Sequence, residues 1–189
     1  MQKVTKIKKL LISNSFFKFW KYQFLVHSYN KKIKPYKIFR EILNVGDVVF
    51  ALCFSTEEKK FYLIKQFRPF YFVRNKTLKY EIVGGLVDKG ESLTNALKRE
   101  IKEEIGDVDI KKKIPMETFI SNDENFLYHT FLCVVEKEFI PKLNTEHDGY
   151  AWVSFGNWPK PLHQGLRKTL QNKMNQVKLD TVFKMLKLM

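Results

Sequence analysis

Three glutamates, Glu100, Glu103 and Glu104, lie in a segment whose spacing of apolar residues predicts a helix. At about 100° per residue, the apolar side chains of this helix form one stripe, the usual core-facing pattern. The stripe consists of Leu93, Ala96, Leu97, Ile101 and Ile105. Glu100 and Glu104 project from the middle of the same stripe, and Glu103 lies on its flank. Two carboxylates one turn apart repel each other, and half-burying them costs roughly several kcal/mol per ion unless something compensates.

A divalent cation would supply that compensation. Hard cations such as Mg²⁺ take oxygen ligands and usually keep waters and substrate phosphates in the rest of their shell. The alternative is a solvated acidic helix face, which is the usual explanation of a glutamate-rich helix. Here the acids interrupt the apolar stripe instead of opposing it, and this placement favours a metal site.

The same stretch also carries glycines and further charges at fixed intervals, GGLVDKGESLTNALKREIKEEIG over residues 84–106. This spacing resembles the Nudix box of the Nudix hydrolase family. The matching positions are Gly85, Glu91, Arg99, Glu100, Ile101, Glu103, Glu104 and Gly106. Asp107 departs from the pattern, since the family usually has an aliphatic residue there, a role that Val108 could fill. The weaker resemblance from about residue 17 to residue 160 implies an α/β fold, with a mixed β-sheet sandwiched between helices (α/β/α) and antiparallel strands at the N-terminus.

The resemblance implies an enzyme that cuts a nucleoside diphosphate linked to another moiety. It places the metal ligands at Glu100, Glu104, Glu103 and the backbone carbonyl of Gly84, with Mg²⁺ or Mn²⁺ as cofactor. A bound metal ion neutralises phosphate charge and lowers the pKa of a bound water.

Other residues of the box have supporting roles. The resemblance makes Arg99 and Glu91 a pair that aligns the box, because partners of this kind fix the orientation of metal ligands. Ser92 is placed to N-cap the helix, and Gly106 to end it in a left-handed conformation.

Upstream of the box, the segment Lys65–Pro69, KQFRP, resembles the ADP-ribose pyrophosphatase branch of the family. That resemblance makes Arg68 a candidate contact for the substrate diphosphate, with a surface salt bridge as the alternative. Glu81 matches an acidic position of that branch. Phe70 is a candidate base-stacking group, with core packing as the alternative. The same two explanations apply to Trp20, Tyr22, Tyr71 and Phe72. In this branch the leading strands also help to form a homodimer.

The general base is not supplied by the box in every branch. In ADP-ribose pyrophosphatases a Glu from a later loop usually serves, and the loop over residues 141–149 is the equivalent place. Glu146 is its only Glu and is therefore the predicted base. Asp148, Glu124 and Glu103 are the alternatives.

Charge and cysteine content limit the other classes of function. Net charge is +14, yet residues 1–40 hold 11 Lys or Arg and no acid, so the remainder is nearly balanced. This basic arm could touch nucleic acid, but a lysine-rich solvated edge is the favoured explanation. No apolar run of about 18 residues exists to span a membrane. Cys53 and Cys133 lie in apolar runs without further Cys or His at ligand spacing, which favours reduced core residues, no zinc site and a cytoplasmic setting.

Hydrophobic patterning predicts the order of the elements. We expect a basic arm over residues 1–15, containing a short helix or frayed end at 3–12, and then a single domain over 16–189. Within that domain we expect N-terminal strands over 16–44, a core over 45–160 and a C-terminal helix over 161–189. The predicted strands are 16–28, 36–43, 48–54, 61–67, 78–83, 110–120, 126–135 and 150–155.

Three functions fit these features. The leading one is metal-dependent hydrolysis of ADP-ribose or a related nucleotide sugar. The second is hydrolysis of a 5′-phosphorylated or capped RNA end, prompted by the basic arm. The third is a non-catalytic nucleotide sensor, against which the intact acids argue.

Overall fold

A computed structural model describes residues 3–14, 18–27, 34–44, 46–66, 78–120, 127–144 and 146–186. Contacts between Cα atoms divide the chain into two units. The first unit comprises Met1–Gly46 with Ile120–Leu127, and the second comprises Asp47–Phe119 with Tyr128–Met189. That residues 16–189 act together as one hydrolase domain stays a prediction.

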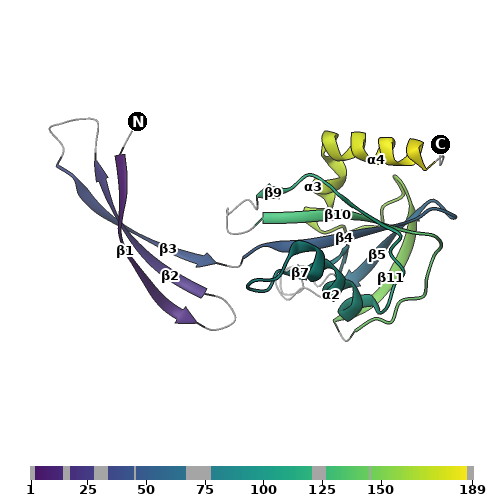
Figure 1. Ribbon diagram of the computed structural model, residues 1–189, viewed down its shortest axis with the longest axis horizontal. Coiled ribbons are helices and arrows are strands. Elements are labelled where there is room, and N and C mark those ends of the chain that lie inside the picture. The colour runs from purple at the N-terminus through teal and green to yellow at the C-terminus, as the bar shows by residue number, and fades with distance from the viewer. Residues whose placement is uncertain are drawn as a thin grey trace. The chain divides into compact units, whose positions relative to one another are not determined.

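The first unit contains a three-stranded antiparallel sheet in the order β1-β2-β3 (Figure 1). Its strands are β1 (Lys3–Asn14), β2 (Lys18–His27) and β3 (Tyr36–Asn44). The expected helix or frayed end at residues 3–12 was therefore wrong. The physical reason is non-local, because β1 pairs along its length with the aromatic strand β2, and pairing of this kind overrides weak local propensity.

Alternating residues of β2 place Trp20, Tyr22 and Phe24 on the same face of that sheet. The rings of Tyr22 and Phe24 are stacked with centroids 5.9 Å apart. Lys9 of β1 lies with its Nζ 3.7 Å from the centroid of the Trp20 ring. These contacts give the first unit its own side-chain packing, which a tail without structure would lack.

The second unit is built on a mixed sheet in the order β11-β5-β4-β10-β8. Strand β4 lies parallel to β10 and antiparallel to β5 and β7. In the same sheet β6 pairs with β5, β7 with β4 and β9 with β10. The strands are β4 (Val48–Ser55), β5 (Lys60–Gln66), β6 (Lys79–Glu81), β7 (Val83–Leu86), β8 (Lys112–Pro115), β9 (Phe119–Ile120), β10 (Leu127–Val135) and β11 (His147–Ser154).

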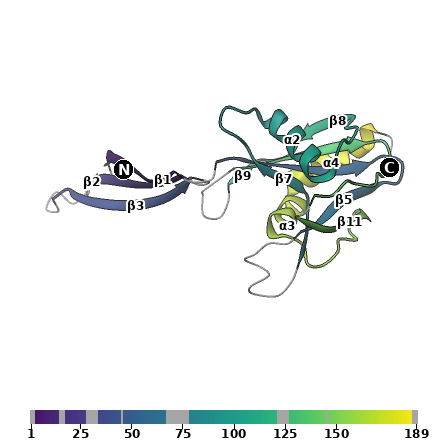
Figure 2. The same ribbon diagram turned by 90° about the horizontal axis from the view of Figure 1, so that it is seen from below.

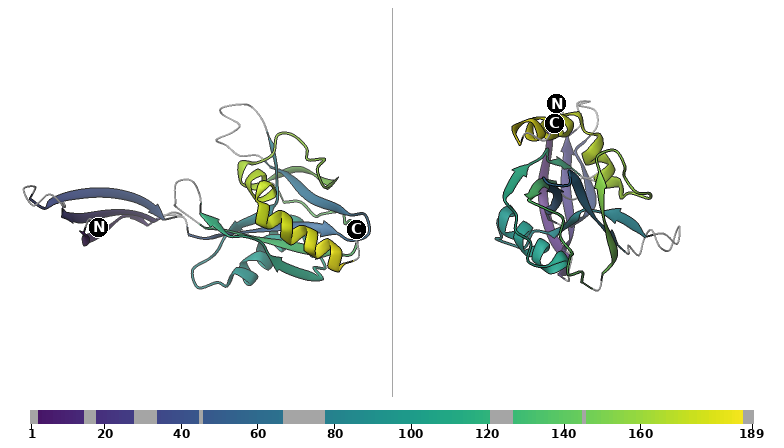
Figure 3. Two further views of the ribbon diagram at one scale, coloured as in Figure 1. Left: turned by 90° about the horizontal axis from the view of Figure 1, so that it is seen from above. Right: turned by 90° about the vertical axis from the view of Figure 1, so that its right-hand side faces the viewer.

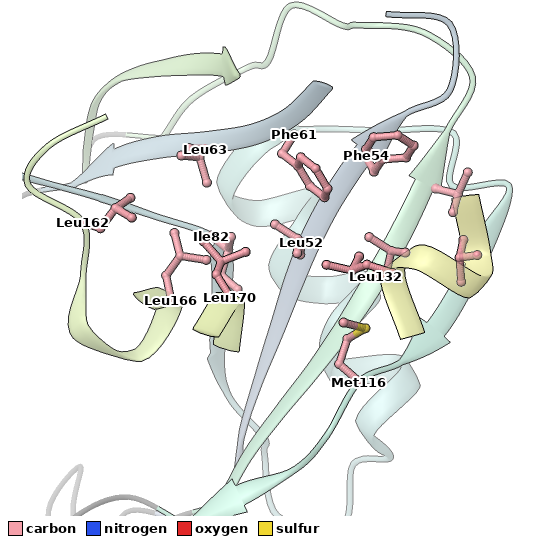
Figure 4. Close-up of a cluster of buried hydrophobic side chains, with 13 residues drawn as sticks. Leu52, Phe54, Phe61, Leu63, Ile82, Met116, Leu132, Leu162, Leu166 and Leu170 are labelled. Carbon is pink, nitrogen blue, oxygen red and sulfur yellow. The ribbon is translucent and has the colours of Figure 1, made fainter. Parts of the chain in front are cut away.

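Helices cover both faces of this sheet, as the predicted α/β/α layering requires (Figures 1 and 3). They are α2 (Leu93–Ile105), α3 (Gln164–Gln171) and α4 (Lys173–Met185). Along β4, Ala51 and Cys53 pack in one core cluster with α2, whereas Leu52 and Phe54 pack in the other with α3 and α4. Figure 4 shows this second cluster. Burial on both faces explains the nearly continuous apolar sequence of β4.

Several predicted elements are divided in the structure. The expected strand over 78–83 is interrupted at Ile82 between β6 and β7, and the one over 110–120 forms β8 and β9. The expected C-terminal helix is two helices, because the Asn172 side chain accepts a hydrogen bond from Asn175 N at 3.0 Å and caps α4. Met174 and Val177 are exposed, although they follow Leu166 and Leu170 at helical spacing. No helix among the described residues is long and apolar enough to cross a membrane.

Asn175 joins the two C-terminal helices to the segment after β8. It is fully buried, its Oδ1 accepts from the backbone N–H of Glu117 at 2.8 Å, and its Nδ2 donates to the Thr169 carbonyl at 3.1 Å. One side chain thus satisfies backbone groups from two segments far apart in the sequence.

Replacing Asn175→Ala should lower the free energy of unfolding by about 3 kcal/mol, because a buried carbonyl and a half-buried N–H lose their partner and a buried side chain is removed. Gln176→Ala is the matched control on the same helix. Its side chain is exposed and donates to Leu170 O at 3.0 Å, so its loss should change stability by about 0.5 kcal/mol or less. Urea denaturation of both variants measures the difference, and equal effects would contradict the bridging role of Asn175.

Candidate active site

Helix α2 begins and ends at the residues that the sequence indicated. Ser92 caps it by accepting a hydrogen bond from Asn95 N at 3.2 Å. At the other end, the Gly106 N–H donates to the Lys102 carbonyl at 3.1 Å. Gly106 has φ 91° and ψ −166°, so its φ is positive as expected, but the predicted left-handed helical conformation was wrong. A positive φ of this kind still favours glycine.

The two central acids of α2 are buried against the glycine pair of β7, which runs beside the helix (Figure 2). Glu100 is 9% exposed and Glu104 is 6% exposed. The backbone N–H of Gly84 donates to Glu104 Oε2 at 3.1 Å. A Cβ on Gly85 would lie 2.5 Å from both carboxylate oxygens of Glu100, so only glycine leaves room for that carboxylate.

Arg99 forms hydrogen bonds that link α2 to β7 and to the loop between them. Its guanidinium donates to the Leu86 carbonyl at 2.8 Å, to Glu91 at 2.9 Å and to Glu100 Oε1 at 2.6 Å. A longer bond of 3.3 Å reaches Glu103, whose side chain is 58% exposed. The expected pairing of Arg99 with Glu91 is therefore present, and the same guanidinium also orients two of the predicted metal ligands.

The electrostatics of the acids differ with their surroundings. Burial raises the pKa of the Glu100 carboxyl, and the hydrogen bond and charge of Arg99 only partly oppose that effect. The hydrogen bond from Arg99 lowers the pKa of the Glu91 carboxyl. A buried carboxylate with a raised pKa gains more from a neighbouring cation than an exposed one does, because water no longer stabilises its charge.

The donor set fits Mg²⁺ or Mn²⁺. Within the described part of the chain, no three His, Cys, Asp or Glu side chains converge as a ready-made metal cage. Mg²⁺ is usually bound by one or two carboxylates together with waters and substrate phosphates, so such a cage is not needed. The buried carboxylates of Glu100 and Glu104 are the oxygen donors that this type of site needs.

The sequence alone did not predict that His147 would lie beside the acids of α2. The predicted strand over 150–155 begins earlier, at His147, and the imidazole of His147 is fully buried. Its Nε2 lies 3.8 Å from Glu104 Oε1. The only local signal was Gly149, two residues later, because glycine inside a strand pattern often marks a bulge that re-aims a side chain.

The other predicted site residues belong to elements other than α2 or fall outside the described ranges. Glu146 is exposed, and its backbone N–H donates to Asn144 Oδ1 at 2.9 Å. Glu81 is buried in β6 and lines a small cavity with Tyr128 and His163 beside α3. Three sets of predicted positions fall outside the described residues: Arg68 and Phe70; Tyr71 and Phe72; and Glu124. Trp20 and Tyr22 belong to the first unit.

Comparisons with known proteins show which sequences and structures this chain resembles. The family model of the NUDIX domain matches residues 46–173. A nucleoside triphosphatase NudI of Escherichia fergusonii is 33% identical over 111 residues, covering 50% of this chain and 75% of that protein. Its Escherichia coli counterpart is 33% identical over 86 residues, which cover 39% of this chain and 60% of that protein.

Two solved structures share the fold. A MutT NUDIX hydrolase from Burkholderia pseudomallei aligns with a TM-score of 0.54 at 21% identity, covering 68% of this chain and 98% of that one. An ADP compounds hydrolase aligns with a TM-score of 0.57 at 15% identity, covering 98% of this chain and 95% of that one. Only the second alignment extends over nearly the whole chain.

The two glycines of β7 should respond differently to the same substitution. A Cβ on Gly84 would overlap the Val49 carbonyl and lie 2.9 Å from Phe50 Cα, so Gly84→Ala should lower the free energy of unfolding by about 3 kcal/mol or more. Gly85→Ala meets only the movable end of Glu100 and should keep the fold while displacing that carboxylate. Misplacement of about 1 Å can reduce turnover by about 10²-fold. Thermal unfolding and turnover separate the two effects, and the reverse assignment would contradict this geometry.

Proposed function

Because this chain belongs to the NUDIX family of hydrolases, we propose that it cleaves the diphosphate linkage of a nucleoside diphosphate joined to another moiety. The substrate class is ADP-ribose or a related nucleotide sugar, and the products are a nucleoside monophosphate and a sugar phosphate. One observation carries the proposal. The carboxylates of Glu100 and Glu104 are buried against two glycines of β7, where an added Cβ would overlap neighbouring atoms.

Mg²⁺ or Mn²⁺ is the proposed cofactor, with Glu100, Glu104, Glu103 and the Gly84 carbonyl as its protein ligands. When bound, the cation would neutralise phosphate charge and polarise the phosphorus that is attacked. Arg99 fixes the ligands, since its guanidinium reaches Glu100, Glu103 and Glu91 at once. Such partners set the direction in which ligand oxygens point.

Glu146 is the proposed general base. In this role its carboxylate takes the proton of the attacking water as the new P–O bond forms and the bridging P–O bond breaks. Its exposure on the loop before β11 is consistent with a group that approaches only when substrate is bound. Arg68 and Phe70 are proposed to contact the diphosphate and the base of the substrate, and Glu81 to act in substrate binding.

Fold coverage supports the choice of substrate class. The ADP compounds hydrolase is similar over 98% of this chain, which includes the first unit, whereas the MutT hydrolase is similar over 68%. We propose that the strands of the first unit contact a second copy of the chain in a homodimer, as in the branch that the sequence resembles. We also propose that the protein acts in the cytoplasm. A second candidate substrate is a nucleoside triphosphate, which the 33% identity with NudI favours.

Glu104→Gln should keep the fold and reduce turnover by more than about 10²-fold. Mutating a residue that only supports a metal ligand already reduces activity or metal affinity by about 10- to 100-fold, and Glu104 is proposed as a ligand itself. The assay offers ADP-ribose, other nucleotide sugars, nucleoside triphosphates and 5′-triphosphate RNA, each with Mg²⁺ and with Mn²⁺. Glu57→Gln, an exposed acid in the β4–β5 hairpin, is the control and should match wild type. Wild-type turnover in folded Glu104→Gln would exclude the metal site. Preferred cleavage of triphosphates would replace the nucleotide-sugar assignment.

Glu146→Gln should reduce turnover by about 10²–10⁴-fold, the usual contribution of a general base. Metal affinity and substrate affinity should change little, because the lost interaction acts mainly in the transition state. The acidic limb of the pH–rate profile should shift or vanish. Glu138→Gln, in the same connection between β10 and β11, is the matched control. An unchanged profile in Glu146→Gln would move the assignment to Asp148, Glu124 or Glu103.

A further inference from the structure

His147 places a buried imidazole at the edge of the acidic cluster of α2. Its side chain has no exposed surface, and its Nε2 lies 3.8 Å from Glu104 Oε1. The proposed mechanism assigns it no task. An imidazole buried in contact range of a buried carboxylate needs a physical reason, because both groups lose hydration there.

A β-bulge directs this side chain inward. His147 is paired with Gln66 of β5, and the pairing resumes between Gly149 and Lys65, so the register shifts at this point. Gly149 has φ 147°, a backbone conformation that other residues rarely adopt. Bulges of this kind are frequent next to active sites, where they re-aim a side chain.

The Glu104 carboxylate lies beside the His147 imidazole with one of its two oxygens. Glu104 Oε2 already accepts the Gly84 N–H, so Oε1 is the oxygen on the side of the imidazole. The hydroxyl of Tyr62 is buried and has no hydrogen-bond partner among the residues that the structure describes. Burial is the main cause that raises the pKa of that hydroxyl, and the negative charge of Glu104 adds a smaller contribution. A buried polar atom without a partner costs about 1–3 kcal/mol, so a polar species beside this hydroxyl would be stabilising.

We propose that His147 is a nitrogen ligand of the divalent cation that Glu104 binds. This inference rests on the proposed function and adds a ligand to its metal site. In octahedral coordination with bonds of about 2.1 Å, adjacent ligand atoms lie about 3.0 Å apart and opposite ones about 4.2 Å apart. The separation of 3.8 Å between Nε2 and Oε1 lies between these two distances, so a small movement of either side chain would let both atoms reach one ion.

A nitrogen ligand changes which cation the site prefers. Carboxylate, carbonyl and water suit Mg²⁺, whereas imidazole suits transition metals, for which affinity rises from Mn²⁺ towards Cu²⁺. With His147 as ligand, the site should bind Mn²⁺ and Co²⁺ more tightly than Mg²⁺. Removing the imidazole should reduce that preference.

Pulsed electron paramagnetic resonance of Mn²⁺ bound to the protein, without substrate, tests the proposal. Nitrogen bonded directly to Mn²⁺ modulates the spin echo, and labelling histidine with ¹⁵N should change the modulation in wild type. His147→Gln should abolish the signal and weaken Mn²⁺ binding by about tenfold or more, with a smaller effect on Mg²⁺. His163→Asn is the matched control, because Asn can still accept the Gly165 N–H that His163 accepts at the start of α3.

Each outcome is decisive. Bound Mn²⁺ without histidine nitrogen coupling would overturn the role of His147 and leave the carboxylate site intact, whereas absence of Mn²⁺ binding would overturn the metal site itself. If His147→Gln does not fold, the other three histidines can be replaced one at a time. A nitrogen signal that survives all three replacements belongs to His147, and a signal lost in any of them would exclude it.

Discussion

The carboxylates of Glu100 and Glu104 repel each other inside the layer between α2 and the sheet. Both are buried, and burial raises the pKa of Glu100 even though the guanidinium of Arg99 is bonded to it. Protein groups therefore compensate the charge of Glu100 only in part. For the two acids together, the compensation includes one backbone N–H of β7 and one arginine, and a bound cation would complete it.

The rest of the second unit holds two backbone segments against that helix. Strand β7 pairs with β4, which is buried on both faces and fixes the position of the glycine pair. Strand β11 pairs with β5 and brings His147 to the same end of α2. Helices α3 and α4 cover the opposite face and are tied to the segment after β8 by Asn175. The burial of the two acids therefore depends on strand pairing as well as on the sequence of α2.

The features that sequence predicted well are those encoded within one short stretch. The apolar stripe of α2, its Ser92 cap and the burial of Glu100 and Glu104 all follow from helical spacing, and the structure confirms them. The features that were missed depend on pairing between distant strands. His147 points inward because of its register with β5, and residues 3–12 form a strand because β2 lies beside them. The roles proposed for Arg68 and Phe70 stay predictions, because neither residue lies in the described ranges.

The most direct measurement of the central claim is the thermal unfolding midpoint as a function of Mg²⁺, with K⁺ at equal ionic strength as the control. A cation that binds only the folded state stabilises it by about 2.7 kcal/mol at 100 times Kd. For a domain of this size that is a rise of about 5 to 10 °C. Wild type should show the rise, and a Glu100→Gln/Glu104→Gln double variant should not. Equal midpoints for wild type with and without Mg²⁺, or an equal rise in the double variant, would contradict the claim that these buried acids hold a cation.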